Sequence, residues 1–228
     1  MTFILIPGAG GQAWYWHRVV PELAALGHDA VAVDLPAGDD SAGWAEYTDA
    51  VVRAIGARDS GLVLVGQSMG GFTAPLVCAR VPVDLVVLVN AMTPAPGETG
   101  GDWWGNTGQA EAAAAFAREQ GRPEDFDVLR DFFHDVPQHV VDDAMARGEP
   151  AQSGTPFGQP WPAGGWPDVP TRFLQGRDDR LFPLAFQRRV ARERLGIDVD
   201  DMPGGHLMAL SQPDELASRL LSRVHKIR

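Results

Sequence analysis

Residues 62–72, LVLVGQSMGGF, limit the possible folds of this chain more than any other segment. Apolar residues suited to a buried strand lead into Ser68, which has Gly66 two positions before it and Gly70 two positions after it. A helix-compatible run follows. A serine on a sharp turn between a strand and a helix has a strained backbone, and flanking glycines let the two elements approach each other. The pattern therefore predicts a nucleophile elbow, with Ser68 as the nucleophile.

The rest of the chain alternates between apolar runs and amphipathic helical patterns. Apolar runs without polar alternation are typical of parallel strands that helices cover on both faces. We expect strands at 3–6, 30–33, 62–65, 85–90, 171–175 and 197–202. We expect helices at 14–26, 44–57, 72–80, 184–195 and, with an interruption at 212–213, at 207–224. This alternation predicts an α/β fold with a mostly parallel sheet of about six strands flanked by helices.

The strand pattern is interrupted between residues 91 and 168. Helical patterns at 109–120, 126–133 and 138–147 are followed there by a segment rich in proline, glycine and tryptophan. We therefore divide the chain into a core of residues 1–90 and 169–228 and a helical cap of residues 91–168, inserted above the carboxyl edge of the sheet. The aromatic residues of the cap either line an apolar substrate pocket or form the cap's own core. The pocket candidates among them are Trp103, Trp104, Phe133 and Trp161.

Composition argues against several classes of partner. The 228 residues carry a formal net charge of −11, which disfavours nucleic acid, because phosphate backbones attract clustered lysine and arginine. The amino terminus lacks the positive segment of a signal peptide, and no apolar run approaches membrane-spanning length. We therefore expect a cytoplasmic protein without a membrane partner. The single cysteine, Cys78, allows no internal disulfide and is expected to be a small core side chain. We predict no metal and no cofactor, and we keep a homodimer as a possibility.

Ser68 needs a base to accept its proton and an acid to orient that base. Among the six histidines, His206 differs in lying on a glycine-rich loop after the last predicted strand, at the same sheet edge as Ser68. The loop after the strand at 171–175 offers two carboxylates, Asp178 and Asp179. The residues thus predict a serine nucleophile, His206 as its base and one of two aspartates as the acid, each at the end of a strand.

A family resemblance extends over nearly all of the chain and is weakest across residues 91–168. The residues that carry it are Pro7-Gly8-Ala9, Ala13-Trp14-Tyr15-Trp16, Val33-Asp34-Leu35-Pro36, Gly66-Gln67-Ser68-Met69-Gly70-Gly71, Asp179 with Pro183, Ala185-Phe186-Gln187-Arg188, and Gly205-His206-Leu207-Met208-Ala209-Leu210-Ser211-Gln212-Pro213-Asp214-Glu215-Leu216. On these residues the sequence resembles the α/β-hydrolase fold superfamily. Within it the chain is most similar to the small esterase and hydroxynitrile lyase group typified by plant methylesterases.

The resemblance implies roles for further residues. The family's acid is an aspartate with a proline four positions after it, and Pro183 stands in that relation to Asp179. Asp179 is therefore preferred to Asp178, which becomes a solvated loop carboxylate. The resemblance also assigns the oxyanion hole to the backbone N–H groups of Ala9 and Met69.

The reaction type can be argued from two positions. The lyases of this group carry threonine where this chain has Gly8, and they carry lysine, which stabilises the departing cyanide, where it has Leu207. The resemblance thus implies hydrolysis of a small apolar ester through a Ser-His-Asp triad and an acyl-enzyme, and we add Leu207 to the substrate pocket. The group usually has histidine where this chain has Pro7, which affects the loop's geometry more than its chemistry. A lyase, a cofactor-free oxygenase and a non-catalytic small-ligand binding protein stay open as alternatives.

Overall fold

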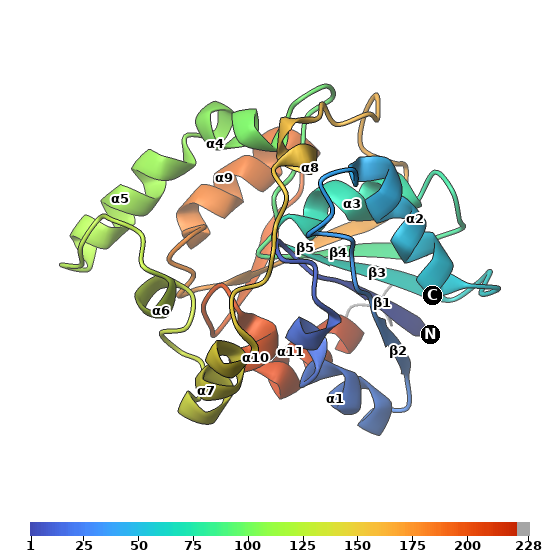
Figure 1. Ribbon diagram of the computed structural model, residues 1–228, viewed down its shortest axis with the longest axis horizontal. Helices are drawn as coiled ribbons and strands as arrows, with labels where there is room; N and C mark the ends of the chain where they lie inside the picture. The colour runs from blue at the N-terminus through green and yellow to red at the C-terminus, as the bar shows by residue number, and fades with distance from the viewer. Residues whose placement is uncertain (223–228) are drawn as a thin grey trace.

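The computed structural model describes residues 1–222, which contain a six-stranded sheet whose strands are all parallel. The strand order across the sheet is β2-β1-β3-β4-β5-β6 (Figure 1). The strands are β1 (Thr2–Ile6), β2 (Asp29–Ala32), β3 (Leu62–Gln67), β4 (Leu85–Val89), β5 (Thr171–Gly176) and β6 (Val199–Met202). The predicted α/β fold with a parallel sheet is confirmed.

Helices cover both faces of the sheet in two layers (Figure 1). The layer on one face consists of α2 (Trp44–Ile55), α3 (Gly70–Val77) and α9 (Leu184–Leu195). The layer on the other face consists of α1 (Val19–Ala25), α10 (Met208–Ser211) and α11 (Pro213–Ser222). Among residues 1–222, no helix has both the length and the apolar character needed to cross a bilayer.

Alternate residues of the central strands enter two separate hydrophobic clusters. Ile4 and Leu64 pack with residues of α2, α3 and α9, whereas Leu5 and Val65 pack with residues of α1 and α11. The register explains this division, because Ile4 pairs with Leu64 and Leu5 pairs with Val65. With both faces of the sheet buried, the strands need no polar side and read as continuous apolar runs.

Two of the helices expected from the sequence are divided in the structure, and a proline explains each division. The helix predicted at 14–26 is a short 3-10 turn, η1 (Ala13–Trp16), followed by α1. Pro21 lies in the first turn of α1, where a missing N–H costs nothing, whereas one continuous helix would place it in the interior. The predicted interruption at 212–213 separates α10 from α11. Residues 223–228, which include the end of the helix predicted at 207–224, lie outside the described residues.

Residues 91–168, called the insertion below, lie at the side of the sheet where the strands end (Figure 1). The insertion contains α4 (Gly100–Thr107), α5 (Gln109–Glu119), α6 (Val128–Asp131), α7 (Gln138–Arg147) and α8 (Thr155–Gly158). The sequence analysis did not predict α4, because its glycines resembled a loop. That helix forms because Thr99 accepts a hydrogen bond from the Asp102 N–H at its start and Trp103 enters the core. The division of the chain into a core and a cap stays a prediction.

Candidate active site

Ser68 lies on the turn between β3 and α3, with a left-handed φ of 50°. Such a φ is strained for a residue with a Cβ. The neighbouring glycines are required by close packing. A Cβ on Gly66 would lie 2.8 Å from the Gly70 carbonyl oxygen, and one on Gly70 would lie 3.0 Å from the carbonyl oxygen of Ile6. The motif glycines therefore let α3 start directly against β1 and β3, and this places Ser68 at the carboxyl edge of the sheet.

The structure brings Ser68, His206 and Asp179 together, although the loops that carry them follow three different strands. His206 Nε2 lies 3.1 Å from Ser68 Oγ, and His206 Nδ1 lies 2.9 Å from Asp179 Oδ2. His206 and Asp179 are buried, and Ser68 is partly exposed. A carboxylate can only accept, so Nδ1 of the neutral ring carries the proton and Nε2 accepts from the serine hydroxyl. This is the arrangement in which imidazole can take a proton from Ser68.

Hydrogen bonds from several directions hold the Asp179 carboxylate in place. Its Oδ1 accepts from the N–H groups of Leu181 and Phe182, each at 2.9 Å, and its Oδ2 also accepts from Gln175 Nε2 at 3.1 Å. A buried carboxylate that accepts this many hydrogen bonds cannot rotate away from His206.

Asp178 lies on the other side of the same loop and does not contact His206. Its exposed side chain accepts a hydrogen bond from the Gly204 N–H at 3.3 Å, and its own N–H donates to the Gly204 carbonyl at 3.0 Å. Asp178 is therefore more than a solvated carboxylate, because it joins the loop after β5 to the loop after β6.

Asn90, at the end of β4, is a site residue that the sequence analysis missed. Its Nδ2 donates to the carbonyls of Gly205 and His206 at 2.9 and 3.0 Å, and its Oδ1 accepts from the Gly176 N–H at 2.7 Å. Asn90 is buried and has a positive φ of 46°, which asparagine tolerates better than most residues. The signal that could have found it is a single amide at the end of an otherwise apolar strand.

The loop after β1 lies directly against the nucleophile. A Cβ on Gly8 would come within 2.8 Å of the Ser68 Cβ, so only glycine allows this approach. Ala9 follows in that loop, and Met69 follows Ser68 at the start of α3. In the part of the chain that the structure describes, the N–H groups of Ala9 and Met69 have no protein acceptor. Both are therefore free to bind a ligand oxygen.

The segment of the insertion between α6 and α7 covers His206. The ring of Phe132 stacks on the imidazole, with centroids 4.9 Å apart and planes 16° apart, and Phe182 meets the imidazole edge-on at 5.2 Å. Nearby, Asp135 Oδ2 accepts from the Gly205 N–H at 2.7 Å. The sequence favoured Phe133 over Phe132 as a pocket residue and gave no sign of Asp135, because a helical pattern at 126–133 does not reveal which of two adjacent side chains faces the site.

The predicted pocket residues comprise two buried tryptophans and three partly exposed side chains. Trp103 and Trp161 are buried in the core, where their indole N–H groups donate to the carbonyls of Thr93 and Phe72. They therefore belong to the hydrophobic cluster that α2, α3 and α9 form on the sheet, and their part in a substrate pocket stays a prediction. The other three candidates are partly exposed and pack against the edges of the two hydrophobic clusters: Trp104, Phe133 and Leu207.

Comparisons with known proteins agree with this fold. The model of the alpha/beta hydrolase family matches residues 3–219. A probable esterase, PIR7A, from Oryza sativa subsp. indica is 28% identical over 96% of this chain and 95% of that protein. A pyrethroid hydrolase from Sphingobium wenxiniae is 27% identical over 95% of this chain and 85% of that protein.

Solved structures with low sequence identity share the fold. The crystal structure of a pyrethroid hydrolase from Sphingobium faniae has a TM-score of 0.74 at 24% identity, over 97% of this chain and 96% of that chain. That of the methylesterase MES16 from Arabidopsis also has a TM-score of 0.74, at 16% identity, over 99% of each chain.

Proposed function

Because the chain belongs to the alpha/beta hydrolase family, we propose that it is a serine esterase that cleaves small apolar esters. The observation that carries the proposal is the continuous hydrogen-bonded path from the Ser68 hydroxyl through His206 to the buried Asp179 carboxylate. Acyl transfer needs these three groups in this order of contact. The names of two relatives, a probable esterase and a pyrethroid hydrolase, favour the same class of reaction.

In the first half of the reaction, Ser68 Oγ attacks the acyl carbon and His206 Nε2 takes the hydroxyl proton. Asp179 stays ionised and stabilises the imidazolium through Nδ1–H. The negative oxygen of the tetrahedral intermediate is bound by the N–H groups of Ala9 and Met69. One such donor typically contributes about 10²–10³ in rate. The intermediate collapses when Nε2–H protonates the leaving alkoxide, so an alcohol departs and an acyl-enzyme remains.

In the second half, water replaces the alcohol. His206 Nε2 accepts a proton from that water while the water oxygen attacks the acyl carbon. The N–H groups of Ala9 and Met69 again bind the oxyanion. Nε2–H then returns the proton to Ser68 Oγ as the acyl–oxygen bond breaks. The products are a carboxylic acid and the free serine, so the cycle needs no metal and no cofactor.

Two side chains beside the imidazole favour hydrolysis. Phe132 presents its ring face to His206, where the negative face of the π system stabilises the imidazolium that forms in each transition state. Leu207, directly after His206, offers no charge to a leaving anion such as cyanide. This favours an ester with an alcohol leaving group over the lyase reaction.

The test is hydrolysis of short-chain p-nitrophenyl and methyl esters by wild type and by Ser68→Ala. We expect wild type to turn over and Ser68→Ala to lose about 10⁴-fold or more in kcat, because the nucleophile is gone. Ser60→Ala changes an exposed serine before β3 and is the matched control, with an unchanged rate.

Full activity in Ser68→Ala would contradict the assignment of the nucleophile. An inert wild type that binds small esters tightly would instead favour the binding-protein interpretation.

A further inference from the structure

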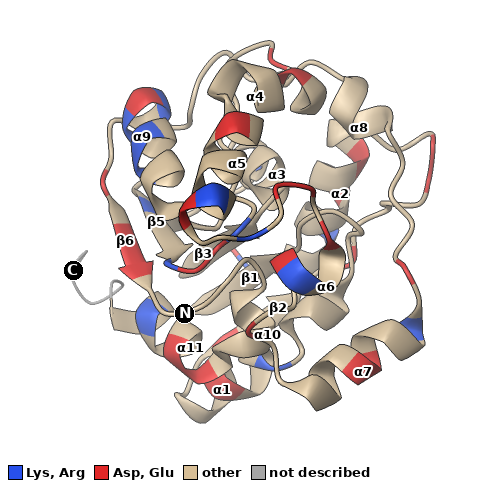
Figure 2. Ribbon diagram, turned by 90° about the vertical axis from the view of Figure 1, so that its left-hand side faces the viewer, with Lys and Arg blue, Asp and Glu red and all other residues tan. Residues whose placement is uncertain are grey.

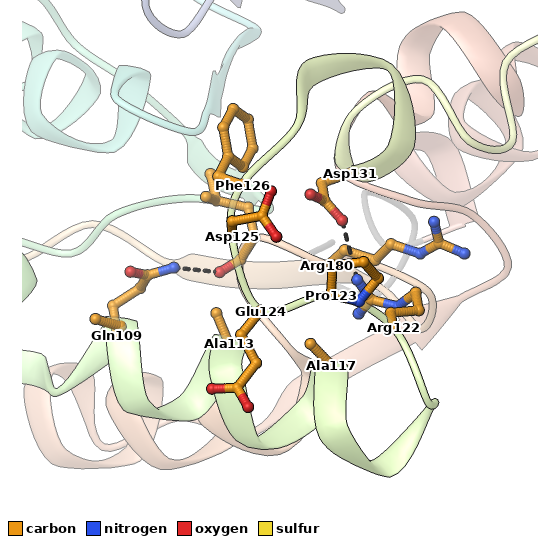
Figure 3. A pocket seen from close by; sticks show the side chains of 12 residues that line it. Gln109, Ala113, Ala117, Arg122, Pro123, Glu124, Asp125, Phe126, Asp131 and Arg180 are labelled. Atoms are coloured by element: carbon orange, nitrogen blue, oxygen red, sulfur yellow. Dashed lines mark hydrogen bonds and ion pairs between the residues drawn. The ribbon is translucent and has the colours of Figure 1, made fainter.

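A cavity of about 220 Å³ lies beside the proposed active site but does not include Ser68 or His206. It is open to solvent on one side and is lined by α5, by residues 122–126 of the loop that leads to α6, and by the loop that follows Asp179 (Figure 3). Its floor is apolar: Ala113 and Ala117 point into it from α5, and Leu181 closes one side. A cavity of this size suits a small ligand with a hydrocarbon body.

One end of the cavity is rich in arginine. Arg122 and Arg180 line that end together with Asp131 (Figure 3). Asp131 binds Arg122 at 2.9 Å and Arg130 at 3.1 Å, whereas within residues 1–222 the guanidinium of Arg180 binds only a neutral group, the Arg130 carbonyl. Two guanidinium groups thus bind the buried Asp131 carboxylate, and a third, that of Arg180, lines the same end of the cavity. Burial, followed by the charge of Arg180, lowers the pKa of Arg122 from its usual value, as expected of a guanidinium with too little negative charge around it.

Arg122 also has an unsatisfied donor at this end. Its side chain is only 13% exposed, and among the described residues its buried Nη2 has no hydrogen-bond partner. A buried guanidinium N–H without an acceptor is costly, and a small turn of the Arg122 side chain would bring Nη2 to an anion in the cavity.

The other two acidic residues that line the cavity are largely exposed, and each lies beside an arginine. Glu124 is 50% exposed and binds Arg118 on the outer surface of α5, and Asp125 is 78% exposed and lies 3.7 Å from Arg130. Solvent screens both carboxylates. Acidic residues outnumber basic ones in the chain and are spread over the face seen in Figure 2, so the group of arginines at the inner end of this cavity differs from its surroundings.

We propose that this cavity binds a small organic carboxylate, with the charged group on Arg122 and Arg180 and the hydrocarbon body against the alanine side of α5. Binding at this site does not depend on ester hydrolysis at Ser68. The site is, however, physically joined to the acid loop, because Arg180 follows Asp179 and Gln109 donates to the Leu181 carbonyl at 2.6 Å.

The experiment is calorimetric titration of the full-length protein with sodium hexanoate. Hexanamide has the same body without the charge, and inorganic phosphate has charge without the body, so both should bind much more weakly. Arg180→Gln should raise the Kd for hexanoate roughly tenfold, because a charge-assisted hydrogen bond is lost. Arg53→Gln, which removes an exposed arginine of α2 that does not line the cavity, should leave the Kd unchanged.

Ala113→Leu provides a second variant that keeps every charge and fills the floor of the cavity. It should abolish hexanoate binding, and thermal unfolding of each variant establishes that the protein is folded. Hexanoate binding that survives both Arg180→Gln and Ala113→Leu, or is displaced by an ester substrate, would locate the ligand at Ser68 and overturn the proposal. Absence of binding to wild type would also overturn it and would leave the arginines with a structural role only. None of these outcomes depends on whether the protein hydrolyses esters.

Discussion

At the residue scale, four contacts from three parts of the chain fix the imidazole of His206. Asp179 binds Nδ1, Phe132 covers one ring face and Phe182 meets the ring edge-on. The Gln67 amide lies 3.4 Å from both Nε2 and the His206 carbonyl oxygen. Because these contacts come from different directions, the ring has a single orientation, and in that orientation Nε2 faces the nucleophile.

The two adjacent aspartates should differ sharply in their effect on catalysis. We expect Asp179→Asn to lower kcat for ester hydrolysis by about 10⁴-fold, because the amide cannot hold the tautomer and orientation of His206. Asp178→Asn keeps an acceptor for the Gly204 N–H and should change kcat by less than about tenfold. Steady-state kinetics of the two variants checks this, and a larger loss in Asp178→Asn would reassign the acid.

Phe132 should influence kcat more than KM, because it acts on the imidazolium and not on the bound ester. Phe132→Leu should lower kcat by roughly fivefold with little change in KM, and Phe132→Tyr, which restores an aromatic face, should recover most of the rate. The matched control is Phe133→Leu, since Phe133 has no ring contact with His206. Equal losses in Phe132→Leu and Phe133→Leu, without rescue by tyrosine, would indicate packing alone.

Sequence reasoning reached the residues that chemistry or spacing identifies, and it missed those chosen by tertiary contact. Ser68 could be predicted because the glycines on either side of it are needed where β3 and α3 pack closely, which leaves a recognisable sequence motif. His206 could be predicted because it lies on a glycine-rich loop after the last strand. Asn90 and Phe132 act across separations of 74 residues or more, and no local pattern records which loop or ring they will meet. Such contacts become visible only once the insertion is folded over the sheet.

At the scale of elements, the strands were predicted well because buried parallel strands have a strong composition signal. The predicted strand at 62–65 extends by two residues as β3, since Gly66 and Gln67 continue the pairing with β1 and β4. The insertion was predicted less well. Glycines at 100, 101 and 105 hid α4, whose position depends on Trp103 in the core. The intrinsic helix propensity of the residues decides whether a segment is helical only where tertiary packing does not override it.

The end of α6 should show a pH-dependent stability that comes from Asp131. Burial alone would raise the pKa of this carboxyl, but the Asp127 N–H and the guanidinium groups of Arg130 and Arg122 together lower it. A carboxyl with a lowered folded-state pKa contributes stability above its unfolded pKa of about 4, and that contribution is lost as the pH falls through the folded value.

We therefore expect Asp131→Asn to lower the free energy of unfolding by about 2 kcal/mol at pH 7, and the difference from wild type should shrink at pH 3.5. Urea denaturation at both pH values measures it. Asp125→Asn, at an exposed carboxylate of the same loop, is the control and should have little effect at either pH. A destabilisation of Asp131→Asn that is the same at both pH values would show that the charge of the carboxylate is not its source.

At the scale of the whole molecule, the parallel direction of all six strands brings the candidate catalytic residues together. Parallel strands all end at the same edge, so loops after β1, β3, β5 and β6 meet there, although they are far apart in the chain. This consequence of the fold could be drawn from the order of strands and helices alone. What could not be predicted is how the insertion lies on that edge, because its contacts with the acid and histidine loops come from irregular backbone between short helices.

The opposite edge of the sheet carries none of these loops, and this matters for attaching the protein to a surface. Burial raises the pKa of the Cys78 thiol to about 12, so near neutral pH it stays protonated and reacts slowly with maleimides. A cysteine placed at the exposed Ser60, in the turn before β3, would then be the reactive thiol. Beads coupled through it would hold each molecule by its amino edge, with the substrate entrance facing the liquid.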